Sequence, residues 1–214
     1  MEQTGRSESE RIRDGYRRLR EQYGAQAWWP CRSGLRWEIV AGAVLTQNCA
    51  WQNVERALER LTAADALSPE AMLALESPTL QELIRPAGFM RQKAAYLKAV
   101  AAFVLEHDAA LASAPPTATR DWRDRLLSVR GIGRETADDI LLYAYGLPVF
   151  IIDAYTRRFC AAELTVDATL PYDRLQTLFE SSLPCDVELY QQYHALIVEW
   201  GKARRRPRPS GKRD

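Results

Sequence analysis

The sequence has few cysteines and no long apolar run, and each of these absences excludes a class of protein. The four cysteines lie far apart, at Cys31, Cys49, Cys160 and Cys185, and no two have C-x-x-C spacing. A zinc or iron–sulfur site formed from neighbouring residues is therefore not expected, and we predict small buried thiols in a reducing compartment. No apolar run approaches the roughly 20 residues that a membrane-spanning helix needs, so we expect no membrane partner.

A secretion signal is also lacking, and the charge is nearly balanced. Residues 1–20 are charged throughout and contain no apolar signal segment, which predicts a cytoplasmic protein. Residues 202–214 carry seven basic side chains and one acidic one, which leaves 22 basic and 27 acidic in the body, a net charge of −5. We therefore expect a basic, disordered tail that adds non-specific attraction to phosphate, on a body whose charge does not identify its ligand.

The periodicity of the apolar residues predicts an all-α fold of about ten helices. Residues 35–47 are apolar on nearly every side, which is typical of a buried central helix. Ser68-Pro69 and Ser77-Pro78 each resemble an N-cap followed by proline at the first helical position. The strand-like run at 149–152 is too short to build a sheet.

We predict five regions along this fold. They are an N-terminal helix over 1–24 that packs with the C-terminal lobe, an aromatic loop over 25–34, a barrel-like helical lobe over 35–150, C-terminal helices over 151–201 that complete a second lobe, and the tail over 202–214. No shift in composition marks a linker between these regions.

The strongest functional signal lies in residues 126–159. A helical turn breaks at Val129-Arg130-Gly131-Ile132-Gly133, a helix resumes at Arg134, and Asp153 follows a second turn at Gly146-Leu147-Pro148. A glycine hairpin between two helices exposes backbone N–H groups at a helix N-terminus, which can bind an anion without a basic side chain. The hypothesis is a phosphate clamp with a carboxylate nearby, and the alternative is a helix–turn–helix with ordinary glycine C-caps.

Together with two upstream blocks, this stretch resembles the helix-hairpin-helix DNA glycosylases of the endonuclease III superfamily. The matching residues are the hairpin with Arg134 to Asp138, the run Ile151-Ile152-Asp153, the block Gly42 to Asn48, and Arg85 to Phe89 with Gln92-Lys93-Ala94. The similarity extends from about residue 28 to 200. It implies a two-lobed all-α fold with a helix-hairpin-helix near 126–145, and base excision repair of double-stranded DNA containing damaged bases by a nucleoid-associated monomer.

The resemblance places Asp153 at the position of the family's catalytic carboxylate. A glycosylase breaks the N-glycosidic bond through a transition state with positive charge on the sugar. An ionised carboxylate stabilises that charge and can orient or deprotonate a water. Aspartate before a helix is also an ordinary N-cap, and the two roles are compatible because capping keeps the side chain fixed and ionised.

Two departures from the bifunctional members of the family narrow the activity. Glu135 stands where those members have a lysine that attacks the sugar, and a carboxylate cannot form an imine. We therefore expect no lyase step and water as the nucleophile, with Glu135 as a solvated acid in the first helical turn. No cysteine follows Trp200, so the iron–sulfur cluster of many relatives is not expected. The one cofactor that the resemblance leaves open is a monovalent cation on the hairpin carbonyls.

These departures make the sequence similar to the 3-methyladenine DNA glycosylases of the endonuclease III type. In that branch Trp28 or Trp29, together with Trp51, matches the rings that stack the flipped base, and Lys202 matches a pocket lysine. An alkylated purine is cationic and gains from stacking on indole faces. The alternatives are core or rim tryptophans, and a lysine that points elsewhere because it would repel a cationic base.

Base flipping leaves a hole in the duplex that needs a plug and a wedge. Gln47 matches the family's plug and Phe89 its wedge, the alternatives being a helix-exit glutamine and a buried turn aromatic. The amides of Gly131, Gly133 and Arg134 would bind phosphate without reading sequence. Two rival functions stay open, namely a mismatch or oxidised-pyrimidine glycosylase and a non-catalytic module that binds damaged DNA.

Overall fold

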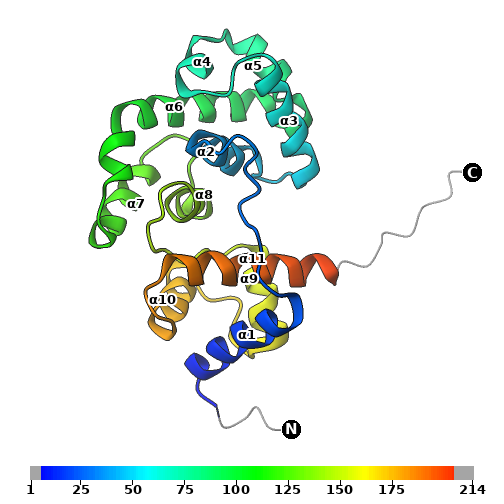
Figure 1. The fold of residues 1–214 in the computed structure, drawn as a ribbon, viewed down its shortest axis with the longest axis vertical. Helices are drawn as coiled ribbons and strands as arrows, with labels where there is room; N and C mark the ends of the chain where they lie inside the picture. The colour runs from blue at the N-terminus through cyan, green and yellow to red at the C-terminus, as the bar shows by residue number, and fades with distance from the viewer. Residues whose placement is uncertain (1–5, 205–214) are drawn as a thin grey trace, which may run out of the picture. The chain divides into compact units, whose positions relative to one another are not determined.

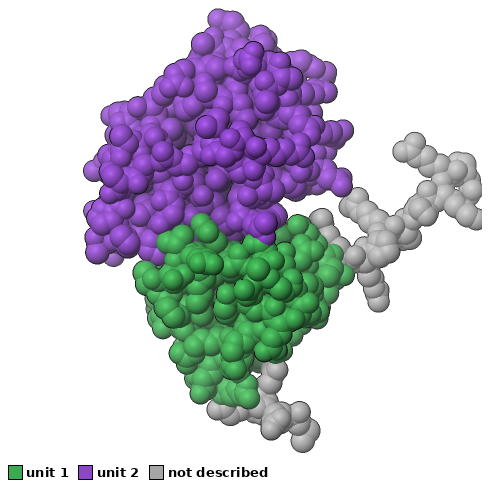
Figure 2. All heavy atoms as spheres, viewed as in Figure 1, with its two compact units in different colours: residues 1–26, 152–214 green, residues 27–151 purple. Residues whose placement is uncertain are grey.

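The computed structural model describes residues 6–204, and within this range the chain is helical and contains no strand (Figure 1). The all-α prediction is confirmed. The chain divides into two compact units, residues 1–26 with 152–214 (unit 1) and residues 27–151 (unit 2), which Figure 2 shows in green and purple. No helix among residues 6–204 combines the length and the apolarity that crossing a membrane requires.

Unit 2 is organised around one buried helix. Its elements are α2 (Arg36–Leu45), α3 (Trp51–Ala63), α4 (Pro69–Ala74), α5 (Ser77–Leu83), η1 (Arg85–Ala87), α6 (Met90–Ala112), η2 (Pro116–Ala118), α7 (Thr119–Leu127), α8 (Arg134–Asp139) and η3 (Ile140–Ala144). Eight of the ten residues of α2 are buried, and α3, α6, α8 and η3 pack around it (Figure 1). The apolar run predicted to be the central helix therefore forms the core of this unit.

The two predicted serine caps have different outcomes. Ser68 is the N-cap of α4, where its side chain accepts a hydrogen bond from the N–H of Ala71. Ser77 is not a cap, because α5 begins at Ser77 itself and Glu76 occupies the N-cap position. Proline is accepted at either of the first two helical positions, since neither N–H has a partner within the helix. The pattern therefore could not fix the first residue of α5.

Unit 1 joins the N-terminal helix to the C-terminal ones. Its elements are α1 (Glu8–Tyr23), α9 (Ala154–Phe159), η4 (Cys160–Leu164), α10 (Tyr172–Ser182) and α11 (Val187–Ala203). Helix α1 packs on α10 and α11, and the buried Tyr193 hydroxyl donates to the Ile12 carbonyl at 2.8 Å. Helix α9 packs on α11, which places the start of α9 against the buried face of α11.

Two predictions at the level of single residues are wrong. Lys202 and Ala203, which we placed in the tail, are the last residues of α11. Cys185 is exposed, and Cys31 and Cys49 are half-buried, so only Cys160 is the buried thiol that we expected. The rest of the predicted tail, 205–214, lies outside the described residues.

Candidate functional site

Asp153 in unit 1 caps α9, as its position before the helix predicts. Its backbone is extended, with φ −89° and ψ −177°, and its Oδ1 accepts a hydrogen bond of 2.6 Å from the N–H of Thr156. The side chain is only 12% exposed. The first turn of α9 therefore holds the carboxylate in one orientation.

His194 of α11 lies beside this carboxylate. Its Nε2 is 3.7 Å from Asp153 Oδ2, a distance within ion-pair range and beyond that of a hydrogen bond. Burial raises the pKa of Asp153, whereas His194 and the N–H of Thr156 lower it, and the balance lies below the ordinary value of 3.8. Asp153 is thus a largely buried carboxylate that stays ionised at neutral pH.

His194 is a residue that sequence reasoning missed. It is one of two histidines in the chain and lies on the buried face of α11 with Tyr190, Tyr193 and Ile197. A single imidazole on an apolar helix face was the available signal, because a buried polar group requires a partner. The partner itself comes from another helix and could not be identified from spacing.

The predicted hairpin of unit 2 joins α7 to α8 and depends on one glycine. Gly131 has φ +85°, and a Cβ at this position would lie 2.1 Å from the ring of Tyr96 on α6. Both the left-handed backbone and the close approach of the ring require glycine there. The buried Ile132 then fixes the hairpin in the core, and its N–H bonds to the Val129 carbonyl at 3.1 Å.

The N-terminus of α8 is open to solvent. Gly133 is its N-cap, and no atom lies within 4 Å of where a Cβ would stand. Gly133, Arg134 and Glu135 are exposed, whereas the side chains from Thr136 to Asp139 are buried. The start of α8 is therefore a solvent-exposed helix N-terminus, the kind of position at which an anion can bind, and Glu135 lies exposed in its first turn, as we expected.

Gln47, the predicted plug, lies against this hairpin. Its Nε2 donates to the Gly131 carbonyl at 3.0 Å and to Thr136 Oγ1 at 2.9 Å. The side chain therefore joins the segment after α2 to both halves of the hairpin. Entry into a DNA duplex would require these two hydrogen bonds to break.

Phe89, the predicted wedge, is 60% exposed. It precedes α6 in the left-handed conformation, with φ 47°. The alternative of a buried turn aromatic is wrong, because most of the ring has no cover in its own unit. A large apolar ring at the tip of a turn has the shape that insertion between bases requires.

Three tryptophans and a tyrosine form one aromatic cluster in unit 2. The ring centroids of Trp29 lie 5.8 Å from Trp28, 5.2 Å from Trp51 and 5.4 Å from Tyr143. Trp29 also packs on α2 at Gly42, where a Cβ would lie 3.2 Å from its ring. Sequence reasoning brought the three tryptophans together but missed Tyr143, which comes from the π-helical segment η3.

The rings of this cluster contact each other and leave no slot for a base. The centroids of Trp28 and Trp51 are 6.0 Å apart at an angle of 48°. Two parallel rings that hold a base between them stand about 7 Å apart, because each stacked contact takes about 3.5 Å. A planar group could therefore stack only on an outer face of the cluster unless the rings separate and rotate.

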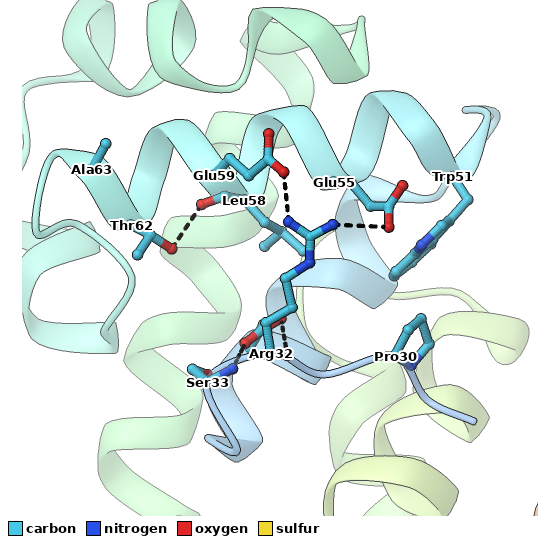
Figure 3. A pocket seen from close by; sticks show the side chains of 10 residues that line it. Pro30, Arg32, Ser33, Trp51, Glu55, Leu58, Glu59, Thr62 and Ala63 are labelled. Carbon is cyan, nitrogen blue, oxygen red and sulfur yellow. Dashed lines mark hydrogen bonds and ion pairs between the residues drawn. The ribbon is translucent and has the colours of Figure 1, made fainter. Parts of the chain in front are cut away.

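Trp51 also lines a surface cavity of about 370 Å³ between α3 and the loop before α2 (Figure 3). Arg32 reaches across from the loop and pairs with Glu55 at 3.3 Å and with Glu59 at 2.5 Å. Glu38 accepts hydrogen bonds from the N–H groups of Arg32 and Ser33 at 2.9 and 2.7 Å. These contacts hold the loop against both α2 and α3.

Lys202 in the last turn of α11 is the remaining predicted residue. Its side chain is 43% exposed, and its Nζ lies 3.5 Å from the carboxylate of Glu199. The ammonium thus has a neighbouring negative charge in its own helix. Lys202 and Asp153 belong to unit 1, and the other candidate residues belong to unit 2.

Comparison with known proteins identifies the family. The model of the HhH-GPD superfamily of base excision DNA repair proteins matches residues 41–185. A putative DNA repair glycosylase of Methanocaldococcus jannaschii is 44% identical over 186 residues, which covers 86% of this chain and 84% of the relative. Endonuclease III of Sulfolobus acidocaldarius is 25% identical over 171 residues, covering 79% and 74% of the two chains.

Solved structures show the same fold. The 3-methyladenine DNA glycosylase of H. pylori, bound to 1,N6-ethenoadenine, superposes with a TM-score of 0.74 at 29% identity, covering 94% of this chain and all of that one. A non-covalent endonuclease III–DNA complex gives a TM-score of 0.75 at 20% identity over 91% and 86% of the two chains. This chain therefore belongs to the HhH-GPD superfamily of base excision DNA repair proteins.

Proposed function

We propose that this chain is a monofunctional DNA glycosylase that hydrolyses the N-glycosidic bond of alkylated purines, 3-methyladenine foremost. The observation that carries the proposal is that the largely buried carboxylate of Asp153 stays ionised, and the resemblance assigns this residue the family's catalytic role. The similarity to a 3-methyladenine glycosylase in complex with a modified adenine supports the choice of substrate.

The chemistry follows from the charge of Asp153. As the N-glycosidic bond breaks, its electron pair leaves with the base and positive charge develops on the sugar, where the carboxylate stabilises it. Water then attacks the sugar carbon and gives its proton to the carboxylate. An alkylated purine is already cationic and leaves as a neutral base, so the reaction needs no general acid.

The aromatic cluster provides the affinity for the base. A cationic purine on an indole face gains stacking and cation–π energy together. Because the cluster rings touch one another, we place the base on the outer face of Trp28 or Trp51, with Trp29 as the support behind them. The resemblance also assigns Lys202 to the base pocket, and its neighbour Glu199 in the same helix would reduce its repulsion of a cationic base.

The hairpin and the two turns that carry Gln47 and Phe89 bind double-stranded DNA. The amides of Gly131, Gly133 and Arg134 bind a phosphate and fix register without reading sequence. Phe89 enters the duplex as the wedge, and Gln47 exchanges its hydrogen bonds to the hairpin for the space that the flipped base leaves.

The enzyme would act as a monomer, and its chemical step would need no cofactor. Glu135 replaces the lysine of the lyases, so no covalent intermediate forms. A monovalent cation would be held by hairpin carbonyls such as those of Val129 and Gly131. Each already accepts one hydrogen bond and keeps a second lone pair. Such a cation would add positive charge near the phosphate.

A panel of damaged duplexes tests the proposal. Release of 3-methyladenine, 7-methylguanine, uracil, thymine glycol and mismatched adenine is measured at excess enzyme, and the alkylated purines should leave fastest. Fastest release of uracil, of thymine glycol or of mismatched adenine would refute the substrate, and binding of abasic DNA without any release would refute catalysis. Borohydride should trap no enzyme–DNA adduct, and purified protein should be colourless; a trapped adduct or a brown cluster would contradict the monofunctional, cluster-free assignment.

A further inference from the structure

Helix α6 carries a buried lysine that the proposed chemistry does not use. Lys93 is 2% exposed, and its Nζ donates to the Leu45 carbonyl at 2.7 Å and to the Ala87 carbonyl at 2.9 Å. Burial lowers the pKa of its ammonium group. An ammonium group loses solvation on burial, so its presence here requires an explanation beyond packing.

The two carbonyls lie at the ends of the elements that precede Gln47, the predicted plug, and Phe89, the predicted wedge. Leu45 is the last residue of α2, two positions before Gln47, and Ala87 is the last residue of η1, two positions before Phe89. Carbonyls at helix ends have no partner within their own helix. One side chain therefore satisfies both ends and fixes the distance between the two turns.

The hairpin is attached to the same face of α6. Tyr96, one helical turn beyond Lys93, packs its ring beneath Gly131, and Gln47 bonds to the Gly131 carbonyl. Residues three apart lie on one face of a helix. We call residues 46–50, 85–89 and 129–133 the motif segments; all three are thus connected through Lys93, Tyr96 and Gln47 within unit 2.

We propose that Lys93 is a positioning residue that holds the Gln47 and Phe89 segments in register, so that plug and wedge enter a damaged duplex together. This inference rests on the proposed function, because it assumes that the motif segments meet DNA. Lys93 acts through Phe89 and Gln47, and its own ammonium, enclosed by backbone carbonyls, does not touch the substrate.

Lys98 offers a matched control on the same helix. Its Nζ donates to the carbonyls of Leu73 and Leu75 at the end of α4, so it forms the same kind of tie to a segment outside the three motif segments. Lys93→Met and Lys98→Met both remove an ammonium group and leave two helix-end carbonyls without it. They differ in which segment is released.

The test uses a duplex that contains a tetrahydrofuran abasic analogue, with 2-aminopurine as the opposite base. Insertion of the plug and wedge unstacks this base and raises its fluorescence at saturating protein, without any excision chemistry. Phe89→Ala is the reference for lost insertion. We expect Lys93→Met to lose more than about half of the wild-type rise, and Lys98→Met to keep it, at matched occupancy of the DNA.

The outcomes separate this inference from the proposed function. Three results overturn the inference, whatever the excision panel shows. They are an equal rise in fluorescence with Lys93→Met and the wild type, an equal loss with Lys93→Met and Lys98→Met, and no rise with the wild type. If Lys93→Met does not fold, Lys93→Arg takes its place. Arginine keeps the charge and the donors, but its larger head displaces the two carbonyls, and the same loss is expected.

Discussion

In unit 1 the candidate carboxylate is fixed by hydrogen bonding and charge, whereas in unit 2 the candidate stacking rings are fixed by packing. Asp153 has the N–H of Thr156 on one oxygen and His194 near the other. Trp29 has two indoles, Tyr143 and the backbone of Gly42 around it. A group that must keep one charge state needs polar partners, and a surface that must receive a cationic base needs exposed aromatic area. Variants confined to one region at a time test this difference.

The hairpin should show the largest effects on stability, and its two glycines should differ. In Gly131→Ala the new methyl group clashes with the Tyr96 ring, and the backbone keeps an unfavourable positive φ. Together these should lower the free energy of unfolding by about 3 kcal/mol and Tm by about 6–12 °C. Gly133→Ala adds its methyl group in open space, so Tm should change little, while affinity for duplex DNA should fall about tenfold because the methyl group obstructs the phosphate.

Calorimetry and a DNA titration check this pair of glycine variants. Equal losses of Tm in the two variants would show that the hairpin is a structural turn only. Unchanged DNA affinity in Gly133→Ala would contradict phosphate binding at the hairpin.

Trp51→Ala should reduce excision selectively. Loss of one stacking ring costs about 1–3 kcal/mol per base, which is about 5- to 150-fold in kcat/KM. The loss should be larger for a cationic alkylated purine than for a neutral base, because the cation–π contribution disappears with the ring. Trp122→Ala on α7 is the control, since that indole packs with Phe103 and His107, outside the aromatic cluster. Equal losses in the two variants, or equal losses for neutral and cationic bases, would contradict the role of the cluster.

His194→Gln should change the pH dependence of excision. Without His194, burial dominates and the pKa of Asp153 rises toward or above its ordinary value. Because the reaction needs the ionised carboxylate, the acid limb of kcat should move to higher pH. In the wild type, the lowered pKa of Asp153 contributes stability that is present above pH 3.8 and lost as pH falls through the folded-state value. Single-turnover rates across pH, compared at full saturation, measure the shift; an unmoved acid limb would show that His194 only fills space.

Gly42→Ala should have the smallest effect. Its methyl group would lie 3.2 Å from the Trp29 ring, so the ring must move by a few tenths of an ångström. We expect KM for an alkylated duplex to rise about two- to threefold with kcat and Tm nearly unchanged. A change in kcat alone would mean that this contact does not act on base binding.

The same contrast between the units explains what the sequence could predict. The fold class, the central helix and the N-cap of Asp153 depend on local spacing, and all three are confirmed. The predicted start of α5 was wrong because proline is accepted at either of the first two helical positions, so local spacing permits two starting residues. His194, Tyr143 and the role of Lys93 depend on contacts between elements far apart in sequence, which no periodicity encodes.

Asp153→Asn is the most direct test of the central claim, that an ionised carboxylate at the start of α9 drives base release. Asparagine is an equally good N-cap, so the fold should be preserved while the charge is lost, and Tm should fall only by the stability that the ionised carboxylate contributes. We predict that single-turnover release of 3-methyladenine falls by about 10²- to 10⁴-fold with DNA affinity unchanged. Release by Asp153→Asn within about twofold of the wild-type rate would contradict the account.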